Sequence, residues 1–243
     1  MSRARQNVMH VAETRMAPDI VESIRWEPRS GGPARWLVVL CHGVGADGSQ
    51  LAHLASTWAE AVPEAAFVAP HAPFPHFARR LRWLPAVRQV RGREWFSILD
   101  RSTATEKAGV RAACRSLDAF ANAELRRLSL PPDALVLAGF SQGATMALFT
   151  GLHCTAALRG IISCAGALIA PEELRADMKN IGPVLLAHGE ADAVVRLVRS
   201  RDAERALRAA GMQVQTLYEP GIGHCVSPTF IVASAAFLRR VLA

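Results

Sequence analysis

The sequence lacks an apolar run long enough to cross a membrane, since a spanning helix needs about 20 consecutive apolar residues. Its first residues, Met1 to Pro18, are polar and basic and contain no apolar core segment. That pattern is not the pattern of a secretory signal. We therefore expect a cytoplasmic protein, with residues 1–20 forming a flexible leader ahead of the folded chain.

Cysteine is also scarce. The chain has five, an odd number, and no two of them form a Cys-x-x-C pair. The five are Cys41, Cys114, Cys154, Cys164 and Cys225, and most of them lie in apolar segments. This usage favours reduced, buried thiols in a cytoplasmic protein over a disulfide framework or a metal site.

Acidic residues are too few to balance the basic ones, which gives a formal net charge of +7. Nucleic-acid binding is the function that such a charge first brings to mind. The arginines are scattered, however, and no motif of a nucleic-acid-binding module surrounds them, so we expect no nucleic-acid partner. The one local cluster runs from Arg79 to Arg93 and is suited to transient contact with anionic substrates or an anionic membrane surface.

The chain shows no internal repeat, no low-complexity tract and no linker composition. Its 243 residues, 51% of them hydrophobic, can build one α/β domain with a full core over residues 21–243. Apolar runs typical of buried strands alternate with helical patterns. This alternation predicts a doubly wound, mostly parallel sheet with helices on both faces.

The expected strands span residues 21–27, 36–41, 65–69, 134–138, 158–164, 184–188 and 214–219. The expected helices span residues 51–62, 103–128, 144–152, 197–210 and 228–242, and a short helix begins at Pro171.

The pentapeptide Gly139-Phe-Ser-Gln-Gly143 lies between an expected strand and an expected helix. In that setting a G-x-S-x-G sequence predicts a sharp turn that lifts the hydroxyl of Ser141 above the sheet. Side chains at Gly139 and Gly143 would collide with neighbouring backbone. The alternative is a glycine-rich turn whose serine caps a helix.

A serine hydroxyl needs a base to take its proton and a third group to orient that base. Asp192 follows the strand 184–188, and His224 follows the strand 214–219, in the chain order Ser, Asp, His that such hydrolases show. Glu190 is the local rival for the acid, and Asp192 could instead be a turn acid or a helix cap.

An oxyanion hole needs two preorganised backbone amides. We expect one from Gln142, directly after the serine, and one from the glycine-rich loop after the strand 36–41. Val44 is the better candidate in that loop, with Gly43 as the alternative. The loop lacks the Lys-Ser/Thr of a phosphate-binding loop, which argues against nucleotide binding. His42 is expected to brace this loop, and His188 to be a buried strand-end histidine.

Residues 71–99 form a long stretch without regular structure that is rich in aromatic residues and proline. A loop of this length is usually functional. We expect it to bind an apolar part of the substrate through Phe74, Trp95 and Phe96. The alternative is a hydrophobic flap that only covers the core.

Together these segments resemble the phospholipase/carboxylesterase family of small α/β hydrolases. Six motifs in order carry the resemblance, at 40–47 (LCHGVGAD), 69–74 (APHAPF), 95–96 (WF), 139–148 (GFSQGATMAL), 188–195 (HGEADAVV) and 223–224 (GH). The likeness implies a minimal α/β-hydrolase fold without a large lid domain, a Ser141–Asp192–His224 triad, an oxyanion hole at Val44 and Gln142, and no cofactor. Three departures are Ala144 for a second glycine, Ser97 for an acid, and the sequence SCAG at 163–166.

The function expected from residues and resemblance together is that of a serine carboxylesterase acting on small-molecule or lipid esters, as a monomer or homodimer. A lysophospholipase or acyl-protein thioesterase is the alternative among enzymes. The alternative of another class is a ligand-binding protein on a hydrolase scaffold that has lost turnover.

Overall fold

A computed structural model describes residues 17–76, 92–99, 103–153, 157–173, 178–180 and 182–243. Seven strands form one sheet in the order β1-β3-β2-β6-β7-β8-β9. All neighbours in this sheet are parallel except the edge strand β1, which pairs antiparallel with β3. The doubly wound, mostly parallel sheet predicted from the sequence is therefore confirmed.

The strands of this sheet are β1 (Ser23–Trp26), β2 (Trp36–Cys41), β3 (Ala65–Pro70), β6 (Leu135–Phe140), β7 (Leu158–Cys164), β8 (Val184–Gly189) and β9 (Val214–Glu219). The α-helices are α1 (Ala52–Ala61), α2 (Thr103–Arg127), α3 (Gln142–His153), α5 (Val198–Ala209) and α6 (Pro228–Val241). Short 3-10 helices are η1 (Gly48–Leu51), η4 (Pro132–Ala134) and η5 (Pro171–Glu173). The helix expected at Pro171 is thus a 3-10 turn over these described residues.

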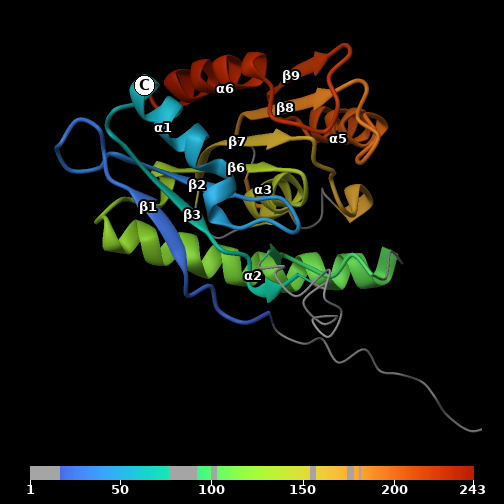
Figure 1. The fold of residues 1–243 in the computed structure, drawn as a ribbon, viewed down its shortest axis with the longest axis horizontal. Helices are drawn as coiled ribbons and strands as arrows, with labels where there is room; N and C mark the ends of the chain where they lie inside the picture. The colour runs from blue at the N-terminus through green and yellow to red at the C-terminus, as the bar shows by residue number, and fades with distance from the viewer. Residues whose placement is uncertain (1–16, 77–91, 100–102, 154–156, 174–177, 181) are drawn as a thin grey trace, which may run out of the picture.

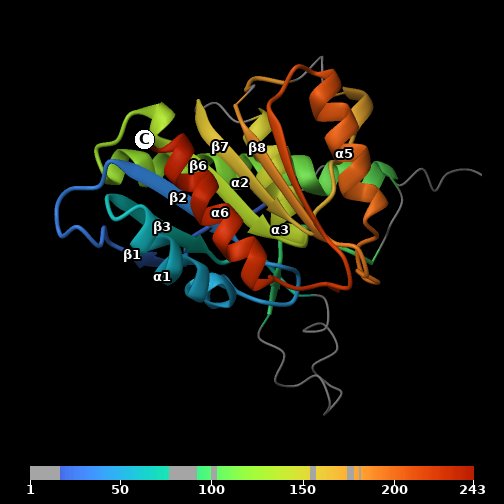
Figure 2. The same ribbon diagram turned by 90° about the horizontal axis from the view of Figure 1, so that it is seen from above.

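Helices cover both faces of the sheet. Helices α1 and α6 lie on one face, and α2, α3 and α5 lie on the other (Figures 1 and 2). Because parallel strands need helical crossovers that return over the sheet, both faces become buried and the strands read as continuous apolar runs. Among the described residues no separate lid domain stands above this three-layer arrangement.

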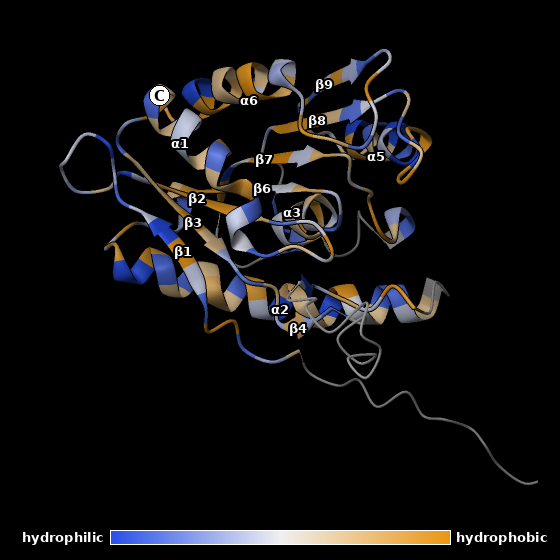
Figure 3. Ribbon diagram, in the orientation of Figure 1, coloured by the Kyte–Doolittle hydropathy of each residue, from blue (hydrophilic) through white to orange (hydrophobic). Residues whose placement is uncertain are grey.

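The core follows the central strands. Every residue of β2, β3, β6 and β8 is buried, whereas every residue of the edge strand β9 is only half-buried. Figure 3 shows this as hydrophobic colour along the middle of the sheet and hydrophilic colour on the outer face of α2. Each fully buried Val or Leu side chain stabilises the fold by about 1.5 to 3 kcal/mol.

The stretch 71–99 departs from the expectation of a wholly irregular loop. Its described ends pair antiparallel as β4 (Phe74–Pro75) and β5 (Arg93–Glu94), with Phe74 opposite Glu94. The remainder, including most of the cluster from Arg79 to Arg93, lies outside the described residues. So do residues 1–16 of the expected leader, while Ala17 is buried and its carbonyl accepts a hydrogen bond from Ser116 at 3.2 Å.

The strand order reverses direction between β2 and β6. Strands β3 and β1 lie on the β2 side of this point, and strands β7, β8 and β9 lie on the β6 side. In open α/β sheets, sites form outside the carboxyl ends of the strands at such a switch point. The loop after β2 and the turn after β6 both lie there, and they hold His42 and Ser141.

Candidate active site

Ser141 occupies the turn between β6 and α3, with a left-handed backbone angle φ of 57°. A non-glycine residue pays about 1 to 2 kcal/mol for this conformation. The turn is held by the amide of Ser141, which donates to the carbonyl of Cys164 at 2.9 Å. The conformation is that of the sharp turn predicted from the G-x-S-x-G sequence.

The two flanking glycines allow the turn to pack against backbone. A Cβ at Gly139 would lie 2.3 Å from the carbonyl oxygen of Gly143. A Cβ at Gly143 would lie 2.0 Å from the carbonyl oxygen of Cys41 at the end of β2. Only glycine fits at either position, for the steric reason expected from the sequence.

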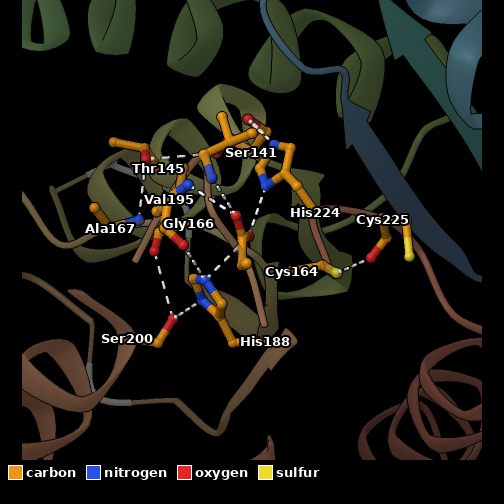
Figure 4. Close-up of polar contacts among 12 residues, drawn as sticks. Ser141, Thr145, Cys164, Gly166, Ala167, His188, Val195, Ser200, His224 and Cys225 are labelled. Carbon is orange, nitrogen blue, oxygen red and sulfur yellow. Dashed lines mark hydrogen bonds and ion pairs between the residues drawn. The ribbon is translucent and has the colours of Figure 1, made fainter. Parts of the chain in front are cut away.

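His224 and Asp192 meet Ser141 from two further loops. Figure 4 shows the ring of His224 directed at Ser141. His224 follows β9, and its Nε2 lies 3.0 Å from Oγ of Ser141. Its Nδ1 lies 2.7 Å from Oδ2 of Asp192, in the turn after β8. The ring of Phe140 packs against the imidazole with a centroid distance of 4.9 Å. The three side chains therefore form one continuous hydrogen-bonded line.

Asp192 is buried and supplied with donors. Its Oδ1 accepts hydrogen bonds from the amides of Val194 at 2.8 Å and Val195 at 2.9 Å. Burial alone raises the pKa of Asp192, but the hydrogen bonds from His224 and from these two amides outweigh burial and hold the pKa below its usual value. An ionised Asp192 accepts from Nδ1–H of His224, which leaves Nε2 free to accept the hydroxyl proton of Ser141.

Glu190, the local rival for Asp192, is exposed and lies 3.9 Å from the guanidinium of Arg201. The other histidine of the segment, His188, is buried as expected. Its Nδ1 lies 2.7 Å from Oγ of Ser200, and its Nε2 lies 2.7 Å from the carbonyl of Val195 and 3.2 Å from Asp192.

In the glycine-rich loop after β2, the two amides considered for an oxyanion hole differ in their hydrogen-bond partners. The amide of Gly43 already donates to Oε1 of Gln50 at 2.8 Å, which leaves the next amide, that of Val44. His42 braces the loop: its Nδ1 bonds the carbonyl of Gly43 at 2.7 Å, and its Nε2 accepts the amide of Ala72 at 3.0 Å. Burial lowers the pKa of His42 to about 4, so its ring is neutral.

Gln142 begins α3, where the first amides of a helix have no partner within the helix. Its side chain has a role that the sequence did not reveal. Oε1 accepts the amide of Trp95 at 2.9 Å, and Nε2 donates to the carbonyl of Phe96 at 2.8 Å. The residue that offers the predicted oxyanion amide thus also fixes the aromatic segment.

A cavity of about 540 Å³ opens beside Ser141. It is lined by Val44, Phe96, Ser97, Ile98, Glu106, Ser141, Gln142, Thr145, Ala167, Val194, Val195, Arg196, Val198 and Arg199. The serine, the two candidate oxyanion residues and an apolar wall therefore share one space, which suits a substrate with a polar reacting centre and an apolar group.

Of the three aromatics expected to bind substrate, only Phe96 lines this cavity. Trp95 is fully buried, and its Nε1 donates to the carbonyl of His42 at 2.9 Å. Its indole therefore packs in the core and holds the loop that begins at His42. Phe74 lies in β4, opposite Glu94. Phe96 therefore lies where the expectation places it, and direct substrate contact by Phe74 and Trp95 stays a prediction.

The comparison with protein families gives a direct result. Residues 28–242 match the model of the phospholipase/carboxylesterase family. The chain belongs to the phospholipase/carboxylesterase family. Membership makes it a carboxylic ester hydrolase and confirms the resemblance stated from its motifs.

Individual proteins are similar to this chain in sequence or in fold. The crystal structure of esterase PE8 is 35% identical, with a TM-score of 0.80 over 90% of this chain and 98% of its own. Acyl-protein thioesterase 1 of Gibberella zeae is 29% identical, over 84% of this chain and 90% of its own length. The carboxylesterase of Bacillus cereus, at 16% identity and a TM-score of 0.72, shows the likeness of fold alone.

For this member of the phospholipase/carboxylesterase family, sequence reasoning missed the segment that leads from Asp192 into α5. Val194, Arg196 and Arg199 line the cavity, and the available signal was their position directly after Asp192. The cysteines also differ in part from expectation: Cys41, Cys114 and Cys164 are free and buried, but Cys225 is free and exposed because it lies in the half-exposed loop of His224.

Within the described ranges, no group of three or more His, Cys, Asp or Glu side chains is placed to hold a metal ion. No helix among those same residues is long and apolar enough to cross a membrane.

Proposed function

We propose that this protein is a serine carboxylesterase in which Ser141 is the nucleophile, His224 the general base and acid, and Asp192 the group that orients His224. The observation that carries the proposal is the line of contacts of 3.0 Å and 2.7 Å that joins the three side chains at the edge of the 540 Å³ cavity. Nucleophile, base and orienting acid in hydrogen-bond contact are what acyl transfer through a serine requires.

Acylation starts when Oγ of Ser141 attacks the ester carbonyl and passes its proton to Nε2 of His224. The carbonyl oxygen becomes an oxyanion, which the amides of Gln142 and Val44 stabilise. The positive end of α3 favours the same charge, since Gln142 is its first residue. Asp192 stabilises the imidazolium that forms. Collapse of the intermediate breaks the bond to the leaving group, and His224 gives that group its proton.

Deacylation repeats these steps with water. His224 takes a proton from a water molecule that attacks the acyl carbonyl, and the same two amides hold the second oxyanion. When that intermediate collapses, the acid leaves and Oγ of Ser141 regains its proton from His224. The chain's own residues supply every proton position in this cycle.

A thioesterase or lysophospholipase is the second candidate. A relative at 29% identity is named acyl-protein thioesterase 1, and this name supports thioesters as a substrate class for this chain. A thiolate leaves more readily than an alkoxide, so the same triad serves both bonds. Rates with oxygen esters and thioesters of matched acyl length separate the two candidates.

The proposal is tested with p-nitrophenyl butyrate and with a fluorophosphonate label. We expect turnover by the unaltered chain and label on Ser141. The variant Ser141→Ala should lose both while its circular dichroism spectrum stays unchanged. A well-folded protein with neither turnover across acyl lengths nor labelling would support the ligand-binding alternative instead.

Residues 21–243 are proposed to act as one catalytic domain that needs no cofactor, works in the cytoplasm and binds no nucleic acid. Its monomeric or dimeric state is measured by light scattering. Any affinity for DNA should be weak and fall steeply with salt, because only scattered arginines would bind phosphates. Tight binding to DNA at physiological salt would contradict this part.

A further inference from the structure

We propose that the preferred substrates are esters that carry an anionic oxygen group, a carboxylate or a phosphate, at the end remote from the reacting carbonyl. This inference rests on the proposed function, since it concerns the same cavity. It names the chemical class of substrate, and the residues that recognise the class are Arg196 and Arg199.

Arg196 and Arg199 are the cations among the described residues of the cavity wall. Both side chains are exposed, and within the described residues neither forms an ion pair with a carboxylate. The remaining arginines of α5 do have acidic partners, which are Arg201–Glu190 at 3.9 Å, Arg205–Asp202 at 2.5 Å and Arg208–Glu204 at 2.9 Å. The cations that line the cavity are therefore the ones available to a ligand.

The first turn of α5 adds to the same field. Val198, its first residue, lines the cavity, and the preceding Leu197 makes no side-chain cap. The amides of a helix start carry a partial positive charge. An anion between Arg196 and Arg199 would thus meet two guanidinium groups, which are suited to planar carboxylate or phosphate oxygens, and a favourable helix end.

Apolar side chains line the same cavity as Ser141 and the two arginines. Phe96, Ile98 and Val195 line the cavity, and Val194 and Val198 are exposed at 72% and 46%. A methylene chain gains by covering such a surface, at about 0.8 kcal/mol for each buried CH₂ group. The cavity therefore favours a substrate with three parts: a reacting carbonyl, an apolar span and an anion.

Glu106 of α2 is the one carboxylate among the described residues that line the cavity. Taken with the two arginines, it gives this described part of the wall a net charge of one positive unit. Substitutions of opposite charge should therefore have opposite effects. Neutralising the arginines must weaken the preference for anionic esters, and neutralising Glu106 must strengthen it.

The first experiment compares kcat/KM for mono-p-nitrophenyl adipate and p-nitrophenyl hexanoate, which share leaving group and carbon chain. A second pair, butyryl-glycerol 3-phosphate and monobutyrin, places the anion on the alcohol side. We expect the anionic member of at least one pair to be preferred by about tenfold at low salt, and the preference to shrink as salt rises. The pair that responds tells which side of the ester faces α5.

The variants decide which residues are responsible. The double variant Arg196→Gln/Arg199→Gln should reduce the ratio of anionic to neutral kcat/KM to about one, and Glu106→Gln should raise it. Arg205→Gln is the matched control, because this cation of the same helix pairs with Asp202 and does not line the cavity. Its ratio should equal that of the unaltered protein.

Neutral esters preferred in both pairs, or a preference that survives the double variant, would overturn the inference and leave the arginines as solvated surface. Failure of the proposed function gives a different result, since then the neutral esters are not hydrolysed either and the fluorophosphonate does not label Ser141.

Discussion

Nε2 of His188 lies 3.2 Å from Oδ2 of Asp192, the same oxygen that bonds Nδ1 of His224 at 2.7 Å. Both side chains of the His188–Asp192 pair are fully buried. Oδ1 of the carboxylate is held by two backbone amides. Two amides therefore hold Oδ1 of Asp192, while His188 and His224 both lie beside Oδ2.

We predict that Asp192→Asn lowers kcat by about ten-thousandfold, because an amide can present Nδ2–H to His224 and favour the wrong tautomer. Steady-state kinetics with p-nitrophenyl butyrate measure the loss. Glu190→Gln is the control, since this neighbouring carboxylate is exposed and paired with Arg201, and it should keep near-normal activity. Equal losses in both variants would mean that the loop, not the carboxylate of Asp192, matters.

The contact of His188 predicts a role in positioning Asp192. In His188→Met the carboxylate loses the imidazole that lies 3.2 Å away, and the carbonyl of Val195 loses its donor at 2.7 Å, so we expect kcat to fall about tenfold with KM little changed. With no imidazole beside Asp192, the pH profile of kcat/KM, its acid limb included, should differ from that of the unaltered protein.

His188→Gln tests whether the donor itself is responsible, because a glutamine amide can reach about the position of Nε2. We expect this variant to recover most of kcat and the original acid limb. If Met and Gln variants lose activity equally and the pH profile stays in place, His188 serves only to fill the core.

The placement of Ser141, Asp192 and His224 followed from the sequence because each residue comes directly after a parallel strand. Strands β6, β8 and β9 run in the same direction, so their carboxyl ends share one edge of the sheet. Periodicity and chain order were therefore sufficient to bring together residues 83 positions apart in the chain.

The substrate-binding surface could not be predicted in the same way. Which aromatic side chain lines a cavity depends on side-chain contacts between distant segments, such as the hydrogen bond from Nε1 of Trp95 to the carbonyl of His42. Neither that bond nor the pairing of β4 with β5 leaves a periodic signal. The motifs pointed to Trp95 and Phe96 together. Only the packing of the folded chain shows that Trp95 is buried and that Phe96 lines the cavity.

Substitution of Gly143, two residues after Ser141, should have a strong steric effect. In Gly143→Ala the added Cβ would lie 2.0 Å from the carbonyl oxygen of Cys41, so the turn or β2 must shift. We expect a loss of about 3 kcal/mol in the free energy of unfolding and a loss of most activity. Urea unfolding and ester hydrolysis measure the two effects.

Gly32→Ala is the matched control for this substitution. A Cβ at Gly32 meets only the hydroxyl oxygen of Ser30, at 3.9 Å, which is ordinary contact. Its unfolding midpoint and activity should stay near those of the unaltered protein. A tolerated Gly143→Ala variant would mean that the backbone between β2 and α3 can yield at little cost.

His42 predicts how stability depends on pH. Burial lowers its pKa from 6.5 to about 4 in the folded protein, so between these values the unfolded chain binds more protons. The contribution is complete above pH 6.5 and is lost as the pH falls toward 4, by roughly 3 kcal/mol in all. Urea unfolding between pH 7.5 and 5 should show the folded state weakening.

Substitution separates His42 from the other groups that titrate in this range. In His42→Gln the amide can replace one of the two bonds to Gly43 and Ala72, but it cannot take up a proton, so the unfolding free energy should vary less with pH. His53→Gln, at an exposed histidine, should leave the slope unchanged. A slope unaltered by His42→Gln would show that the ring takes up protons equally in the folded and the unfolded protein, so that burial does not lower its pKa.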